Sequence, residues 1–216
     1  MKTVNFNECT LDFLDTQFNL LPSISLPILQ NWVTTSMLLS AEDVYMIRKS
    51  TNNLRLNAAH WNEQDLSLHF IGPIFAWVGF TEILRFNIFT QVNMEAHIDN
   101  IVLLGRVDEL IATGFRSPKI PFFAFNEYKR GQDYKGDALG QALAAMLVGQ
   151  CLNTDGKPIY GCCVIGQNWY FMTLEGKQYA ISSTFDGTNF EDACQILRIL
   201  YQLKQYCMER TEGMGV

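Results

Sequence analysis

Two apolar segments with charged residues near one end constrain the fold of this 216-residue chain most strongly. The first reads GRVDELIATG at 105–114, and the second reads PFFAFNEYKRG at 121–131. The nearly continuous apolar run at the start of the second segment is typical of a strand in a sheet that is covered on both faces. Successive side chains of a strand point to opposite faces, so Glu127 and Lys129 point the same way and Tyr128 the other way. The sequence therefore predicts a charged pair at the end of a buried strand.

Asp108 in the first segment would place a second carboxylate beside Glu127 if the two strands are neighbours. Two carboxylates that face a common point offer the hard oxygen ligands that Mg²⁺ prefers, and an adjacent Lys129 suits metal-assisted hydrolysis. The alternative is an ordinary ion pair on an exposed strand face, which would contribute little to stability. Burial without a partner or cation would be costly for either group of the pair, and this favours a functional role.

A helix is predicted after the second strand, with Asp137 as its N-cap and the sequence ALGQALAAMLVGQ at 138–150. Gln141 shares a helical stripe with apolar residues, at a position where packing alone would favour Leu. Two interpretations of Gln141 remain open: it lines a site beside Glu127 and Lys129, or it bonds to a loop carbonyl.

A second helix start is predicted upstream, where Asn62 is the cap and Glu63 lies in the first turn. Glu63 projects onto the helix face that carries Phe70 and Ile74, which suggests that its carboxylate faces inward. The alternative is a surface glutamate that stabilises the positive end of the helix dipole. Pro73 is expected to kink or end this helix.

The order of these residues resembles the PD-(D/E)XK nuclease superfamily: an acidic residue on a helix, Asp108 on a strand, Glu127-Tyr128-Lys129 on the next strand, and Gln141 on the following helix. The strings WNEQDLSLHFIGP, GRVDELIATG, PFFAFNEYKRG, GDALGQALAAMLVGQ and PIYGCCVIG are similar to those of a group of small, uncharacterised bacterial proteins assigned to that superfamily. The resemblance implies a mixed sheet flanked by helices, and a site that binds one or two Mg²⁺ ions (or Mn²⁺) and cuts a phosphodiester bond.

The resemblance also implies a role for each matched residue. Asp108 and Glu127 would be the metal ligands, with the backbone carbonyl of Tyr128 as a third oxygen. Lys129 would orient or activate the attacking water and offset charge on the phosphate.

Two further positions follow from the same resemblance. Glu63 would occupy the acidic position on the helix, and Gln141 the polar position on the helix after the lysine strand. The chain departs from the family motif in having Val107, in place of proline, before Asp108. Glu109 is a competing carboxylate, expected on the opposite face of the strand.

The expected fold class is α/β (α+β), with a restriction-endonuclease-like mixed sheet flanked by helices and an extra N-terminal helical segment. Residues 1–56 are predicted to be a helical extension packed on a core at 57–216, within a single compact domain. Helices are expected over 27–49 and 190–208 and from residue 63, and strands over 91–113 with a turn at 99–100, and over 122–129, 159–165, 169–174 and 178–184.

Overall charge is unfavourable for a nuclease, because the net charge is -6 and counterion release by basic residues supplies much of the affinity for nucleic acid. Residues 105–135 are locally positive, however, with six basic side chains against four acidic ones, including Asp133 and Lys135. The predicted partner is nucleic acid, DNA in preference to RNA. The chain has no helix-turn-helix or zinc-finger pattern, so sequence-specific recognition would need a partner subunit or a homodimer.

The sequence also predicts a cytoplasmic protein without a membrane partner, because no apolar run is long enough to span a bilayer and the first residues do not show the basic-then-apolar pattern of a signal peptide. The six cysteines form no C-x-x-C pair and are expected to be reduced.

Three hypotheses for function therefore remain. The first is a Mg²⁺-dependent nuclease, and the second is a catalytically inactive binding or assembly module with the same fold. The third is a structural or interaction protein whose charged strand pair is exposed and incidental, with Gln141 bonded to backbone elsewhere.

Overall fold

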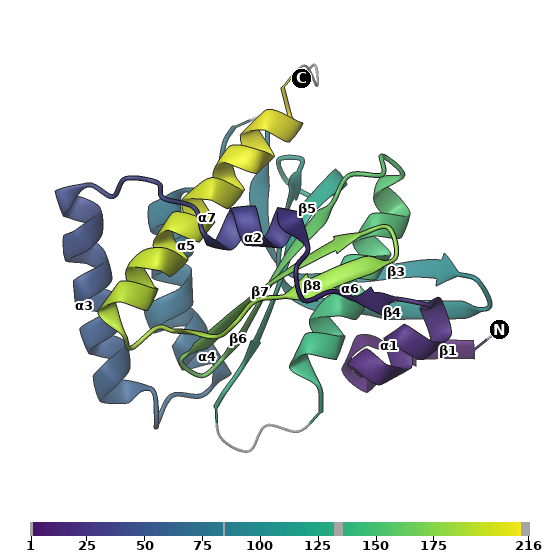
Figure 1. Cartoon of the computed structure of the whole chain (residues 1–216), viewed down its shortest axis with the longest axis horizontal. Coiled ribbons are helices and arrows are strands. Elements are labelled where there is room, and N and C mark those ends of the chain that lie inside the picture. Colours follow the sequence, from purple (N-terminus) through teal and green to yellow (C-terminus); the bar gives the residue numbers. More distant parts are fainter. Residues whose placement is uncertain (1, 84, 132–135, 213–216) are drawn as a thin grey trace.

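The computed structural model describes residues 2–83, 85–131 and 136–212 and contains a mixed sheet with helices on both faces (Figure 1). Within these residues nine strands form one sheet in the order β1-β4-β5-β6-β7-β8-β2, while β3 pairs with β4 and β9 with β7. The expected fold class is confirmed. The strands are β1 (Lys2–Asn5), β2 (Leu21–Pro22), β3 (Asn87–Ile98), β4 (Ile101–Thr113), β5 (Lys119–Lys129), β6 (Ile159–Ile165), β7 (Asn168–Glu175), β8 (Gln178–Ile181) and β9 (Phe185–Asp186).

Two hydrophobic clusters cover the two faces of the sheet. One is formed with the helices at the left of Figure 1, and the other with α1 and α6 at its right. The helical elements are η1 (Phe6–Glu8), α1 (Leu11–Phe18), α2 (Pro27–Val33), α3 (Ala41–Asn57), α4 (Glu63–Leu66), η2 (Ser67–Ile71), α5 (Gly72–Val78), α6 (Ala138–Asn153) and α7 (Phe190–Arg210).

The N-terminal segment contributes strands to the sheet as well as the expected helices. Strand β1 runs parallel to the start of β4, and β2 pairs in parallel with β8. The helix predicted over 27–49 is divided into α2 and α3. The division has a local cause, because the Ser40 side chain accepts from the Asp43 amide while the Asp43 carboxylate accepts from the Ser40 amide, which forms a capping box that starts α3.

The helix predicted from residue 63 continues to Val78 as three successive segments, α4, η2 and α5. Its middle, η2, is a π-helical segment in which the Gly72 amide bonds back to the Ser67 carbonyl. Pro73 follows at the start of α5. A π-helical turn shifts the hydrogen-bond register, which suits a proline that lacks an N–H group.

The remaining predicted elements are present, with small differences at their ends. The hairpin between β3 and β4 turns at Asp99, whose φ of 52° places it in the left-handed region. Strand β8 ends at Ile181, three residues earlier than predicted. All six cysteines are free, as predicted. Over the described ranges, no helix has the length and apolar character needed to cross a membrane.

Candidate active site

A polar cavity of about 370 Å³ lies where β4, β5 and the first turns of α4 and α6 approach one another. The structure brings all five predicted site residues to this cavity. Side chains from the N-terminal segment complete its wall. The lining residues are Asn5, Phe6, Asn7, Glu63, Gly105, Arg106, Asp108, Glu127, Lys129, Gly136, Asp137 and Gln141.

The site lies at a fork in the sheet. Strand β3 pairs with β4 along most of its length, so β1 and β5 share the other edge of β4. β1 pairs with residues 101–104 and β5 with residues 109–113, which leaves 105–108 open between them. Asp108 lies at the point where β5 separates from β4. The fork therefore exposes a carboxylate inside an otherwise continuous sheet.

The Asp108 carboxylate closes the end of the β4–β5 pairing. Its Oδ2 accepts a hydrogen bond of 2.9 Å from the Tyr128 amide, and its Oδ1 accepts one of 3.0 Å from Gln91 Nε2. The amide and carbonyl of one strand residue point to the same edge of the strand. The Tyr128 carbonyl consequently lies on the edge of β5 that faces Asp108.

Glu127 and Lys129 share one face of β5 and form an ion pair, as the strand periodicity predicted. Glu127 is only 3% exposed, so the interpretation of an incidental surface pair is wrong. Burial raises the pKa of Glu127 to about 7, and the negative charge of Asp108 adds to the effect. Burial also disfavours the Lys129 ammonium, but the charge and hydrogen bond of Glu127 outweigh burial and raise the pKa of Lys129. Lys129 therefore remains a cation at neutral pH.

Glu63 and Gln141 approach the same cavity from two helix starts. Asn62 caps α4 by accepting from the Asp65 amide, and this places Glu63 in the first turn. Glu63 is an exposed residue at the rim of the cavity, and its charge contributes to the raised pKa of Glu127. Gln141 is half-buried in the first turn of α6 and lines the cavity.

Asp137 connects the N-terminal segment to the site. Its Oδ1 accepts from the Gly140 amide and caps α6, as predicted, while its Oδ2 accepts from the Leu11 amide at the start of α1. Phe6 of η1 packs against Gly105, where an added Cβ would collide with the Phe6 ring. These contacts hold residues 5–7 against the cavity.

Glu109 lies on the opposite face of β4 from Asp108, as predicted. It is buried, and its Oε2 accepts a hydrogen bond of 2.7 Å from the Tyr128 hydroxyl. Burial raises the pKa of Glu109 to about 7, and the charge of Asp108 adds to the rise, while the Tyr128 hydrogen bond and the neighbouring Asn126 side chain oppose it. Glu109 is thus separated by the sheet from the cavity that Asp108 lines.

The donor set fits a Mg²⁺ ion held by two carboxylates. Burial and the negative charge of Asp108 both disfavour the ionised form of Glu127. A divalent cation between the two carboxylates would offset these effects and favour the ionised form. In the part of the chain that the structure describes, no cluster of three or more His, Cys, Asp and Glu side chains is placed to hold a metal. Mg²⁺ is commonly held by one or two carboxylates, with waters and substrate phosphate as its other ligands.

Sequence reasoning missed Asn5 and Asn7 as site residues and included Arg106 only as one of the basic side chains of residues 105–135. The two asparagines come from a segment about a hundred residues before β4, and no local pattern links them to the site. Arg106 had a local signal, because it lies two residues before Asp108 and strand periodicity places both on one face. Asp133 and Lys135, which contributed to the local charge estimate, lie outside the described residues.

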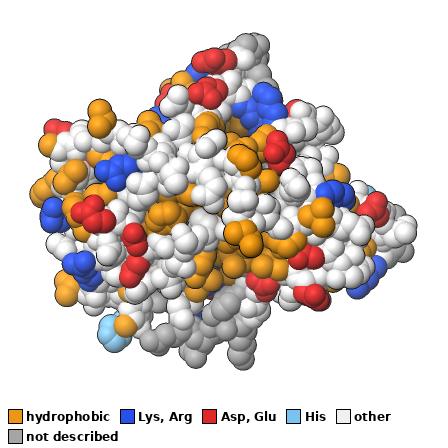
Figure 2. All heavy atoms as spheres, viewed as in Figure 1, with side chains coloured by type: hydrophobic (Ala, Val, Ile, Leu, Met, Phe, Trp, Pro, Cys, Tyr) orange, Lys and Arg blue, Asp and Glu red, His pale blue; other side chains and the backbone are white. Residues whose placement is uncertain are grey.

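A larger cavity of about 820 Å³ lies beside β8 and β2, but none of its lining residues is charged. Figure 2 shows hydrophobic side chains gathered over β8 on this side of the molecule, with Lys and Arg scattered singly. The larger cavity has no carboxylate, imidazole, thiol or ammonium group for acid–base or metal chemistry, so the smaller polar cavity is the candidate active site.

No family model matches the chain, and no curated protein is significantly similar to it. Among solved structures, the chain matches part of a DrdV–DNA complex determined by cryo-electron microscopy, with 12% sequence identity and a TM-score of 0.43. The match covers 76% of this chain and 14% of that chain. A likeness at this level does not bear on the activity of the present protein.

Proposed function

We propose that the protein is a Mg²⁺-dependent nuclease that hydrolyses phosphodiester bonds in nucleic acid, DNA in preference to RNA. The observation that carries the proposal is the convergence of Asp108, Glu127 and Lys129 on one polar cavity at a fork in the sheet. The preference for DNA rests on the family resemblance. A homodimer or partner subunit is proposed to supply any sequence preference, because the sequence has no DNA-reading motif.

Asp108 and Glu127 would hold the metal, and the edge position of the Tyr128 carbonyl suits a third oxygen ligand. When bound, Mg²⁺ would polarise the phosphate and lower the pKa of a coordinated water. Glu127 must release its proton to bind the cation, because its pKa of about 7 leaves it partly protonated at neutral pH.

Lys129 would act as a fixed positive charge during hydrolysis. Its raised pKa makes it a poor proton acceptor, so it would orient the attacking water by hydrogen bonding and stabilise charge on the phosphate. The water oxygen would form a bond to phosphorus while the bond from phosphorus to the leaving oxygen breaks; the proton lost by the attacking water would pass to solvent, and a solvent water would protonate the leaving oxygen. Glu63, at the rim, would hold a water that completes the metal shell, and Gln141 would hydrogen-bond the substrate or that water.

A cleavage assay with labelled single- and double-stranded DNA and RNA tests the proposal. The wild type should cleave at least one substrate with Mg²⁺ and none with EDTA. Removal of one charged group from the site should reduce the rate by about 100-fold or more. Asp108→Asn and Lys129→Ala should show that loss, whereas the matched control Glu109→Gln, which changes the neighbouring carboxylate on the other face, should retain the activity.

Two results would contradict the nuclease proposal. Equal cleavage by wild type, Asp108→Asn and Lys129→Ala would place the chemistry elsewhere or in a contaminant. Binding of an oligonucleotide without cleavage under any divalent metal would favour the inactive binding module.

A further inference from the structure

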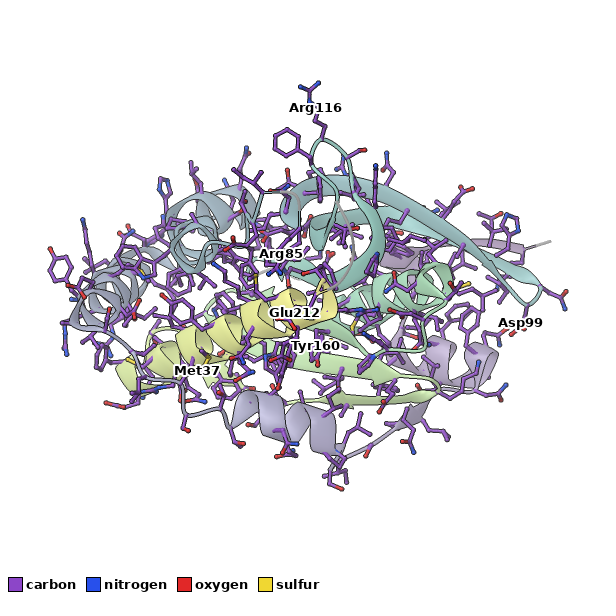
Figure 3. All side chains as sticks on the ribbon, turned by 90° about the horizontal axis from the view of Figure 1, so that it is seen from above. Met37, Arg85, Asp99, Arg116, Tyr160 and Glu212 are labelled. Carbon is purple, nitrogen blue, oxygen red and sulfur yellow. The ribbon has the colours of Figure 1, made fainter. Side chains whose placement is uncertain are left out.

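A second groove adjoins the candidate active site. It has a volume of about 570 Å³ and follows β3 and β4 away from the carboxylates. Three of its lining residues, Asn5, Gly105 and Arg106, also line the active-site cavity. Figure 1 shows β3 and β4 extending together away from the α3 and α7 side of the molecule, with β1 beside the start of β4, and Figure 3 labels Asp99 at the turn between them. The two hollows therefore adjoin one another along β4.

Gly105 forms the passage between the two hollows. The Phe6 ring packs directly against its Cα, in the space where any other residue would place a Cβ. Phe6 therefore covers one face of Gly105, and what stays open beside it is the edge of β4, where residues 105–108 pair with neither β1 nor β5.

Arg106 is the positive charge shared by both hollows. It is exposed and lies two residues before Asp108 on the same strand. Two residues of a strand span about 6.6 Å, a separation comparable to that of adjacent phosphates along one nucleic-acid strand. Among the described residues Arg106 has no ion-pair partner, so its guanidinium is available to a ligand.

We propose that the substrate strand continues from the carboxylate pocket across Gly105 into the second groove, where Arg106 binds the phosphate next to the one that is cut. This inference rests on the proposed nuclease function and names its substrate more closely as a strand with at least two phosphates. Arg binds phosphate through two parallel hydrogen bonds, which gives both affinity and orientation. The amides of Asn5 and Asn93 line the same groove and can bond to sugar or base, while Glu95 opposes the phosphate charge.

Binding is measured by fluorescence anisotropy with labelled oligodeoxynucleotides in EDTA, where no metal-dependent cleavage occurs. Arg106→Gln should weaken binding by about tenfold at low salt. It should also lower the slope of log affinity against log salt by about 0.7 for a single strand, the value of one phosphate contact. Arg116→Gln is the matched control, because Figure 3 shows Arg116 projecting away from the body of the protein, outside both hollows. Glu95→Gln should change affinity in the opposite direction and strengthen binding.

A length series tests the second phosphate directly. Extension from a dinucleotide with one phosphodiester to a trinucleotide with two should increase the affinity of wild type and Arg116→Gln but leave that of Arg106→Gln nearly unchanged. If Arg106→Gln and Arg116→Gln bind alike while wild type binds and cleaves, the role of Arg106 is refuted and the nuclease function stands. If wild type binds no oligonucleotide of DNA or RNA, both the inference and the proposed function are refuted.

Discussion

Replacement of Glu109 by Gln should stabilise the protein at alkaline pH. Glu109 is buried beneath the site with the Tyr128 hydroxyl as its hydrogen-bond donor, and its other oxygen, Oε1, has no partner among the described residues. Gln has nearly the same shape and keeps an oxygen for Tyr128. It also offers an amide N–H toward Asn126, which lies directly opposite Glu109 in the β4–β5 register.

The magnitude follows from the raised pKa of Glu109. Because the pKa is about 7 in the folded protein against a reference value of 4.5, the native state holds this proton more tightly than the unfolded chain. The stability contributed by the protonated carboxyl is complete below pH 4.5 and is lost as pH rises to about 7. Over that window the loss is on the order of 3 kcal/mol. The Gln variant cannot ionise and should not lose this stability.

Urea denaturation in EDTA at pH 5 and pH 8.5, followed by circular dichroism, checks this prediction. The free energy of unfolding of Glu109→Gln minus that of wild type should increase by about 3 kcal/mol between the two pH values. The exposed Glu175 provides a control, since Glu175→Gln should show a difference near zero at both pH values. A Glu109→Gln variant that is no more stable than wild type at pH 8.5 would refute the reasoning.

Three further predictions concern the metal, the fork and the ion pair between Arg210 and Asp155. Mn²⁺ affinity measured by calorimetry should rise about tenfold per pH unit up to pH 7, because Glu127 must lose its proton to bind the ion. An affinity that does not change between pH 5.5 and 7 would argue against Glu127 as a ligand. Gly105→Ala should lower the free energy of unfolding by about 1–3 kcal/mol through collision with Phe6, and an unchanged melting temperature would contradict this packing. Asp155→Ala should cost about 1–3 kcal/mol in urea denaturation, because the buried Arg210 loses a carboxylate whose two oxygens accept from its Nη2 at 2.7 and 2.9 Å; a cost below about 0.5 kcal/mol would show that water replaces the carboxylate.

Local periodicity was sufficient to predict part of the candidate site. Side-chain alternation placed Glu127 with Lys129 and separated both from Tyr128, and the structure shows this arrangement. The capping residues Asn62 and Asp137 were also evident, because short polar side chains before apolar helical stretches have few other structural roles.

The other features of the site depend on contacts between different strands. Whether Asp108 or Glu109 faces the cavity depends on the register in which Glu109 pairs with Asn126, and register is set by contacts between strands. The place of Asn5 at the cavity depends on the parallel pairing of β1 with β4, which joins segments about a hundred residues apart. Neither fact is encoded in a single local pattern.

Calorimetric titration with Mn²⁺, as a surrogate for Mg²⁺, tests the central claim most directly. Wild type and Glu109→Gln should bind the ion at pH 8, whereas Asp108→Asn and Glu127→Gln should each lose most of the binding heat, because two carboxylates provide the protein's charged ligands. Binding by Asp108→Asn equal to that of wild type, or loss of binding in Glu109→Gln alone, would contradict a metal site at the fork between β4 and β5.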